Sequence, residues 1–178
     1  TITIAGTPTN PGTYNYSIAL QGGTCTNSAF ATGQIIVNDL PGVYLGSAAN
    51  TNAQTVCINQ GIGTIYYQFY GTSGGSSGIT GVTISGLPSG ISGTFYPHPN
   101  SPVVHINGST NQTGTFPYTI TSVGGTCSAI SVSGTITISP PTVAGAVTGS
   151  ATVCAETNST TLTLSGHTGN VLYWQSSQ

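Results

Sequence analysis

Three histidines, four cysteines and two carboxylates are the side chains of this 178-residue sequence that could carry out acid–base, nucleophilic or metal-binding chemistry near neutral pH. The histidines are scattered, as His98, His105 and His167. A catalytic triad needs a Ser or Cys, a His and usually a carboxylate, and glycoside hydrolysis needs two carboxylates in one cleft. Asp39 and Glu156 lie far apart in the sequence, so neither arrangement is expected. We predict that the chain is not an enzyme.

The cysteines lack the spacing and the neighbours of a metal or catalytic site. No Cys-x-x-Cys pair occurs and the histidines are not grouped, so zinc is not expected. No Lys or Arg is present to favour a reactive thiolate, and clustered carboxylates for Ca²⁺ are absent as well. We therefore predict no metal and no cofactor. Four cysteines in a strand-rich composition indicate an oxidising, extracellular compartment.

Charge is almost absent from the whole chain. Charged residues make up 1% of the sequence, against about 25% in a typical globular domain. Without Lys or Arg to contact phosphates, binding to nucleic acid or to anionic lipid is excluded. No apolar run approaches the roughly 18 residues of a membrane helix, so no membrane insertion is predicted in this segment. Alternating Ile, Val, Thr, Tyr and Phe can bury a core, which argues against disorder.

The sequence repeats internally. Residues 4–25 match residues 106–127 at a constant offset of 102, with glycines, aromatic residues and the final cysteine in register. A second match, at an offset of 97, relates residues 55–57 to residues 152–154. The repeats predict a segment of a longer precursor with three parts: the C-terminal half of an immunoglobulin-like repeat (1–39), a complete repeat (40–140) and the N-terminal part of a further module (141–178).

Period-two alternation predicts short strands throughout and no helix. Seven short strands in about 100 residues are typical of an immunoglobulin-like sandwich. The expected fold class is therefore all-β, with tandem immunoglobulin-like antiparallel β-sandwich domains in an extended array. Leu40-Pro41-Gly42 and Pro140-Pro141 are interpreted as short, stiff linkers between the domains. The predicted strands of the complete repeat lie near 54–59, 64–70, 80–85, 93–96, 102–107, 115–121 and 132–139.

Two sequence runs carry a more specific resemblance. GLPSGISG at 86–93, followed by VHINGSTNQTGTFPYTIT at 104–121, resembles the pattern of an immunoglobulin-like repeat family, and ITIAGTPTNPGTYNYSI at 2–18 keeps that pattern more fully. The departure is Gly-Ser-Thr at 108–110, where the family usually has Gly-Thr-Pro. The paired cysteines, the GGTC turn and the GTITI ending resemble immunoglobulin-like or cadherin-like repeats of giant secreted adhesins of gliding Bacteroidota, and 152–177 resembles a neighbouring module. The resemblance implies an architecture more than a function.

The position of the cysteines in the repeat leads to a disulfide prediction. Cys57 lies on the first predicted strand of the complete domain and Cys127 at the start of the sixth, and we predict that they are bonded. The bond would close a loop of about 70 residues and contribute about 3–4 kcal/mol. Cys25 and Cys154, as their counterparts, would have partners outside this sequence. Trp174 resembles the buried core tryptophan of immunoglobulin-like strands.

Aromatic residues are the remaining candidates for contact with a ligand. In the strand TIYYQFYG, one face takes Ile65, Tyr67 and Phe69, which we assign to the core, and the other takes Tyr66, Gln68 and Tyr70. The alternative is that the second set packs beneath neighbouring loops. His105 is interpreted as a surface residue of a strand. The candidate surface-contact residues are Tyr66, Tyr70, Tyr96 and His98, the last in a proline-bracketed loop.

Taken with the near-zero charge, these features predict a structural repeat of an extracellular cell-surface adhesin or filament that forms a semi-rigid stalk or fibre. Self-association through strand edges is expected because electrostatic repulsion is nearly absent. The alternatives are a carbohydrate-binding module, with surface glycans as partners, and a spacer in a larger secreted protein.

Overall fold

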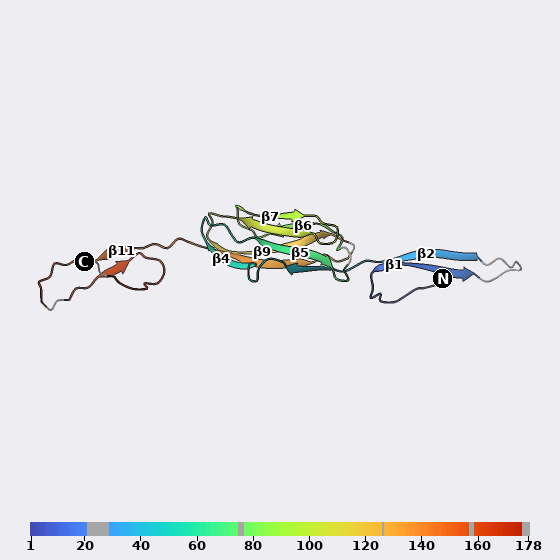
Figure 1. Cartoon of the computed structure of the whole chain (residues 1–178), viewed down its shortest axis with the longest axis horizontal. Coiled ribbons are helices and arrows are strands. Elements are labelled where there is room, and N and C mark those ends of the chain that lie inside the picture. Colours follow the sequence, from blue (N-terminus) through green and yellow to red (C-terminus); the bar gives the residue numbers. More distant parts are fainter. Residues whose placement is uncertain (21–28, 75–76, 126, 157–158, 176–178) are drawn as a thin grey trace.

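A computed structural model of the chain describes residues 1–20, 29–74, 77–125, 127–156 and 159–175. Within these ranges the secondary structure is twelve β-strands, arranged in three units that follow one another along the longest axis of the molecule (Figure 1). A hairpin of β1 and β2 comes first, a sandwich of β3 to β10 second, and a hairpin of β11 and β12 last. No helix in the described part is long and apolar enough to cross a membrane.

The middle unit is a sandwich of two four-stranded sheets, ordered β3-β5-β8-β7 and β4-β10-β9-β6. This is the A-B-E-D and C-F-G arrangement of immunoglobulin-like domains, with β4 added beside the last strand. The predicted fold class is confirmed. Every pair in the two sheets is antiparallel except β4 and β10, which run parallel. The strands are β3 (Pro41–Leu45), β4 (Ala53–Cys57), β5 (Ile65–Gly71), β6 (Ile79–Ser85), β7 (Ile91–Tyr96), β8 (Val103–Gly108), β9 (Gly114–Gly124) and β10 (Ser131–Ser139).

One hydrophobic core fills the space between the two sheets. In β5 the expected alternation holds, because Ile65, Tyr67 and Phe69 are buried while their neighbours face outward. Burying an apolar side chain of this size contributes about 1.5–3 kcal/mol, so these strands hold the sheets together. The other buried apolar residues of the core are Ile62, Ile79, Ile91, Val104, Ile106, Tyr118, Ile120, Ile136 and Ile138.

Two tyrosines meet inside this core. The hydroxyl oxygens of Tyr67 and Tyr118 are 3.2 Å apart, and the Tyr67 hydroxyl also lies 3.5 Å from the backbone oxygen of Ser133. Burial and the hydrogen bond shared with Tyr67 raise the pKa of Tyr118 far above its ordinary value. The Tyr118 ring lies across Gly134, its partner in the β9–β10 register; a β-carbon there would overlap the ring and lie 2.5 Å from the backbone oxygen of Asn52.

The first unit is a hairpin of β1 (Gly12–Leu20) and β2 (Ala29–Val37) that repeats the β9–β10 hairpin. Tyr16 stands opposite Gly33 in the first hairpin, as Tyr118 stands opposite Gly134 in the second. This shared register supports the predicted internal repeat. Tyr16 is 37% exposed and Tyr118 only 1%, because no second sheet covers the first hairpin within the described residues.

The third unit contains only the three-residue strands β11 (Ala146–Thr148) and β12 (Thr163–Ser165). Trp174, expected to be a buried core residue, is 61% exposed. That expectation is wrong, because the described part of this unit forms one short hairpin and no opposing sheet that could enclose an indole ring.

Leu40-Pro41-Gly42 is not a linker, which corrects one prediction. Pro41 begins strand β3 and pairs with Gly71, and Thr72 donates its backbone N–H to the oxygen of Leu40 over 2.9 Å. A proline is tolerated there because β3 is an edge strand and Pro41 is its first residue. The sandwich therefore has eight strands and not seven. Strand β3 was not predicted because Pro41 and Gly42, its first two residues, interrupt the alternation of apolar and polar residues.

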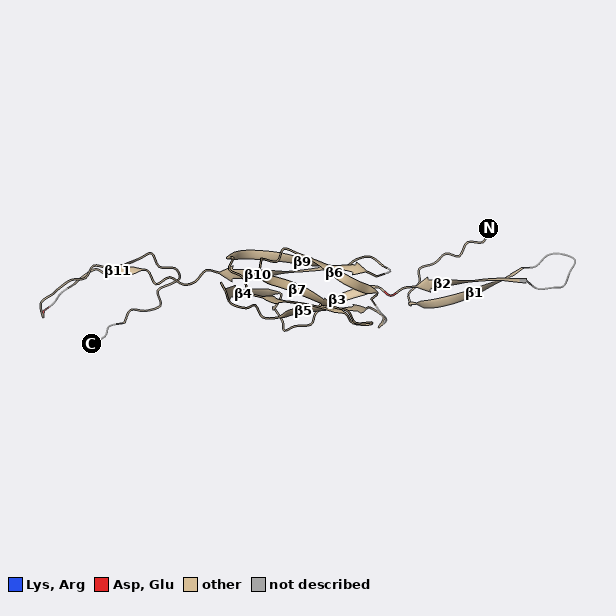
Figure 2. Cartoon of the chain, turned by 90° about the horizontal axis from the view of Figure 1, so that it is seen from above, with Lys and Arg blue, Asp and Glu red and all other residues tan. Residues whose placement is uncertain are grey.

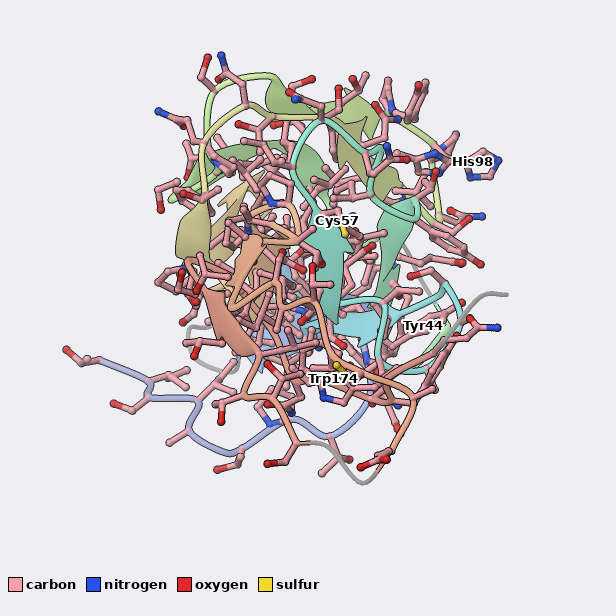
Figure 3. The ribbon with its side chains drawn as sticks, turned by 90° about the vertical axis from the view of Figure 1, so that its left-hand side faces the viewer. Tyr44, Cys57, His98 and Trp174 are labelled. Atoms are coloured by element: carbon pink, nitrogen blue, oxygen red, sulfur yellow. The ribbon has the colours of Figure 1, made fainter. Side chains whose placement is uncertain are left out.

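The predicted disulfide between Cys57 and Cys127 is also wrong. Both thiols are free, and Cys57 lies at the end of the sandwich that faces the viewer in Figure 3. Cys57 pairs with Ser139, the last residue of β10, whereas Cys127 precedes Ser131, the first residue of β10. The first and last residues of β10 are eight residues apart, which corresponds to roughly 26 Å along the strand. A disulfide needs α-carbons within about 7 Å of each other. The parallel pairing of β4 with β10 carries Cys57 to the far end.

Candidate functional site: an aromatic sheet face

The outward side of the β3-β5-β8-β7 sheet gathers most of the exposed aromatic residues of the sandwich. Strand alternation places the even-numbered residues of β3, β5 and β7 and the odd-numbered residues of β8 on this side. We call this surface the aromatic face and define it by six residues: Tyr44, Tyr66, Gln68, Tyr70, Tyr96 and His105.

His105 lies at the centre of one half of the aromatic face. It is the cross-strand partner of Tyr66, and their ring centroids are 5.4 Å apart. From the other side, Tyr96 meets the imidazole in an edge-on arrangement at 5.1 Å. Aromatic pairs in such offset and edge-to-face geometries add about 0.5–1.5 kcal/mol beyond area burial. The three rings therefore form one ordered cluster across β5, β8 and β7.

Tyr44, Gln68 and Tyr70 form the other half. Tyr44 stands opposite Gln68 in the β3–β5 register, and its hydroxyl donates to Oε1 of Gln68 over 2.7 Å. The ring centroids of Tyr44 and Tyr70 are 5.8 Å apart. Tyr44 is 47% exposed, so this contact orients its ring without covering it.

Two glycines of the neighbouring chain segment let tyrosine rings lie low on the sheet. Gly42 is the cross-strand partner of Tyr70, and a β-carbon there would stand 2.7 Å from Cε1 of that ring. Gly46 donates its backbone N–H to the oxygen of Tyr66, and a β-carbon there would stand 2.5 Å from Cζ of the Tyr66 ring. Each ring thus occupies the place that a side chain at the glycine would take.

The aromatic face contains no Asp, Glu, Lys or Arg side chain. No Lys or Arg exists in the sequence, and the ribbon in Figure 2 accordingly shows no blue. Asp39 lies beyond the end of β5, where its carboxylate accepts hydrogen bonds from the hydroxyl of Thr72 and the backbone N–H of Ser73. Among the described residues, no three His, Cys, Asp or Glu side chains gather as a metal site.

The structure places Tyr66, Tyr70 and Tyr96 on the same sheet face, whereas His98 lies outside the strands. His98 is exposed in the β7–β8 loop, with Nδ1 3.2 Å from the hydroxyl of Ser101. In Figure 3 it projects toward the same side of the molecule as Tyr44. Sequence reasoning missed Tyr44, which lies on the unpredicted strand β3. It also missed the central place of His105, which depends on the strand register.

The residues thus define an all-β, immunoglobulin-like protein with a neutral aromatic sheet face. A family model described as a domain of unknown function (DUF8696) matches residues 143–178. No curated protein matches the chain. Among solved structures, the crystal structure of the S-layer protein SbsC domains 4 and 5 is similar, with 18% sequence identity and a TM-score of 0.38. The match covers 72% of this chain and 58% of that chain.

Proposed function

We propose that the chain is a structural repeat segment of an extracellular cell-surface adhesin or filament, and that it forms a semi-rigid stalk. The observation that carries this proposal is the course of the chain through the sandwich. The chain enters from β2 at one end and leaves toward β11 at the opposite end (Figure 1). Repeats joined in this way add to length and not to width.

The connections between the units support a stiff array. Only residues 38–40 separate β2 from β3, and only residues 140–145 separate β10 from β11. The first connection is also fastened to the sandwich, because Asp39 accepts hydrogen bonds from Thr72 and Ser73 and Leu40 accepts one from Thr72. Short, hydrogen-bonded connections restrict rotation of one unit against the next.

Composition supports the finer parts of the proposal. A chain without Lys or Arg offers no trypsin site and little charge repulsion, which suits an exposed fibre and lateral self-association through the edge strands β3, β7, β4 and β6. The resemblance of the repeats to those of gliding Bacteroidota adhesins favours a cell-surface location. We propose a structural role without catalysis for the same reasons.

Small-angle scattering of the 178-residue chain tests the stalk. A compact protein of this length has a radius of gyration of about 16 Å. We expect a clearly larger value, together with a length that grows in proportion when copies of residues 40–140 are joined in tandem. A radius near the compact value, or tandem copies that fold back on one another, would overturn the proposal.

A further inference from the structure

We propose that the aromatic face binds a neutral polysaccharide, with its sugar rings stacked on the tyrosines of β3, β5 and β7. This goes beyond the stalk, because it assigns a ligand class to one side of the sandwich. Four features support this assignment: the exposed rings, the polar groups between them, the absence of Lys and Arg, and the size of the surface.

The tyrosine rings of the aromatic face are held in place and partly exposed. Tyr66 and Tyr70 rest against backbone at Gly46 and Gly42, which fixes both rings low on the sheet. Tyr70 is 37% exposed and Tyr96 is 49% exposed. The face of an aromatic ring carries partial negative charge, and the C–H hydrogens on the apolar side of a pyranose carry partial positive charge. Stacking of the two therefore places opposite partial charges in contact.

Hydrogen-bonding side chains lie between the rings. Gln68 lies between Tyr66 and Tyr70 along β5, and His105 pairs across the strands with Tyr66 on one side and Thr94 on the other. An amide, an imidazole and a hydroxyl can each exchange hydrogen bonds with sugar hydroxyls. Alternation of apolar rings with polar groups matches a saccharide, whose ring faces are apolar and whose edges carry hydroxyls.

The neutrality of the aromatic face selects among polysaccharides. A carboxylated or sulfated chain would need Lys or Arg for charge-assisted hydrogen bonds, and the sequence has neither. The rings are also held before any ligand arrives, through the Tyr44–Gln68 hydrogen bond and the contacts of His105 with two tyrosines. Because a pre-ordered tyrosine loses little entropy on binding, a modest stacking energy becomes useful affinity.

The size of the surface favours a saccharide over a second protein molecule. Tyr66 and Tyr70 are separated along β5 by about 13 Å, and the four strands span about 14 Å. The resulting footprint of roughly 180 Å² is far below the roughly 800 Å² that each partner buries in a stable protein interface. It is long enough for several sugar units in a row, so an extended chain is the fitting occupant.

Binding of the 178-residue chain to insoluble neutral polysaccharides, cellulose, chitin and β-glucan, tests this inference, with alginate and polygalacturonate as acidic probes. We expect saturable binding to at least one neutral polymer, unchanged between about 50 and 500 mM salt, because the aromatic face has no Asp, Glu, Lys or Arg whose interactions salt could screen. The double substitution Tyr66→Ala and Tyr70→Ala should weaken it at least about tenfold. Tyr14→Ala, which removes a ring of 46% exposure from the first unit, is the matched control and should bind normally.

Three results would overturn the proposal: binding that the double substitution leaves intact, binding only to the acidic polymers, or no binding to any neutral polymer. Circular dichroism confirms that each variant keeps its sheet structure. A concentration-dependent dimer that the double substitution abolishes, without polysaccharide binding, would assign the aromatic face to a second copy instead. Scattering by the same variants reports on the stalk independently, since neither tyrosine lies in the connections between units.

Discussion

The buried pair of tyrosine hydroxyls leads to a prediction about alkaline stability. Tyr118→Phe removes one oxygen from the core and keeps the ring that lies across Gly134. The Tyr67 hydroxyl loses the partner at 3.2 Å and keeps only the longer approach to Ser133. A buried hydrogen bond between neutral groups contributes about 1 kcal/mol, so the free energy of unfolding at pH 7 should fall by about that amount.

Above pH 10 the stability advantage of wild type over Tyr118→Phe should shrink and, near pH 11, disappear. The folded pKa of Tyr118 is raised, so the proton stays on Tyr118 in the folded state when the unfolded chain, with a tyrosine pKa of about 10, releases it. Stability contributed by the neutral hydroxyl is therefore complete below pH 10 and is lost as the pH rises above it. Wild type loses about 1.4 kcal/mol per pH unit from this group, and by pH 11 the loss is about 1.4 kcal/mol.

Urea unfolding followed by circular dichroism at pH 7, 9, 10 and 11 measures this difference. Circular dichroism is the right signal because Trp174 lies outside the sandwich and is exposed. The advantage of wild type should shrink above pH 10 and vanish near pH 11. Unfolding free energies of wild type and variant that fall in parallel between pH 9 and pH 11 would refute the assignment of the lost stability to Tyr118.

Three further outcomes are expected. Gly134→Ala should lower the unfolding free energy by about 1–3 kcal/mol, because its β-carbon meets the buried tyrosine ring and a backbone oxygen; thermal unfolding unchanged from wild type would contradict this close packing. Ile136→Ala should lower the unfolding free energy by about 2–5 kcal/mol. Ile35→Ala, at the equivalent position of the first hairpin but 41% exposed, should lower it by under about 1 kcal/mol, and equal losses would show that the first hairpin is covered as fully as the sandwich core. Under mild oxidation Cys57 and Cys127 should not form a disulfide, and both thiols should react with a thiol reagent after denaturation. A disulfide-linked pair of peptides that contains both cysteines would disprove the strand register described above.

Much of the fold was predictable from local pattern alone. Alternation in β5, β8 and β10 identifies the core residues from the sequence alone, because successive side chains of a strand point to opposite faces. Strand β3 was missed because Pro41 and Gly42 are also typical of a linker, and their role as the start of an edge strand depends on pairing with β5. The disulfide prediction failed because sequence order does not tell which way an edge strand runs beside its neighbour.

The candidate site was predictable only in part, for a related reason. Tyr66 and Tyr70 share a face within one strand, so their common side follows from spacing. The contribution of His105 requires the register of β8 against β5, and that of Gly42 and Gly46 requires knowing which ring lies over which backbone. Such cross-strand relations join residues far apart in the sequence and have no local signature.

The parallel pairing of β4 with β10 has a mechanical consequence for a protein anchored at one end and held at the other. Tension applied along the array draws the start of β4 and the end of β10 in opposite directions along their own axes. The five register pairs from Thr135–Ala53 to Ser139–Cys57 then slide as a set, so their hydrogen bonds resist together and do not open one after another. A sandwich held in shear in this way resists stretching more strongly than one peeled from an end, and the short strand β4 acts as its clamp.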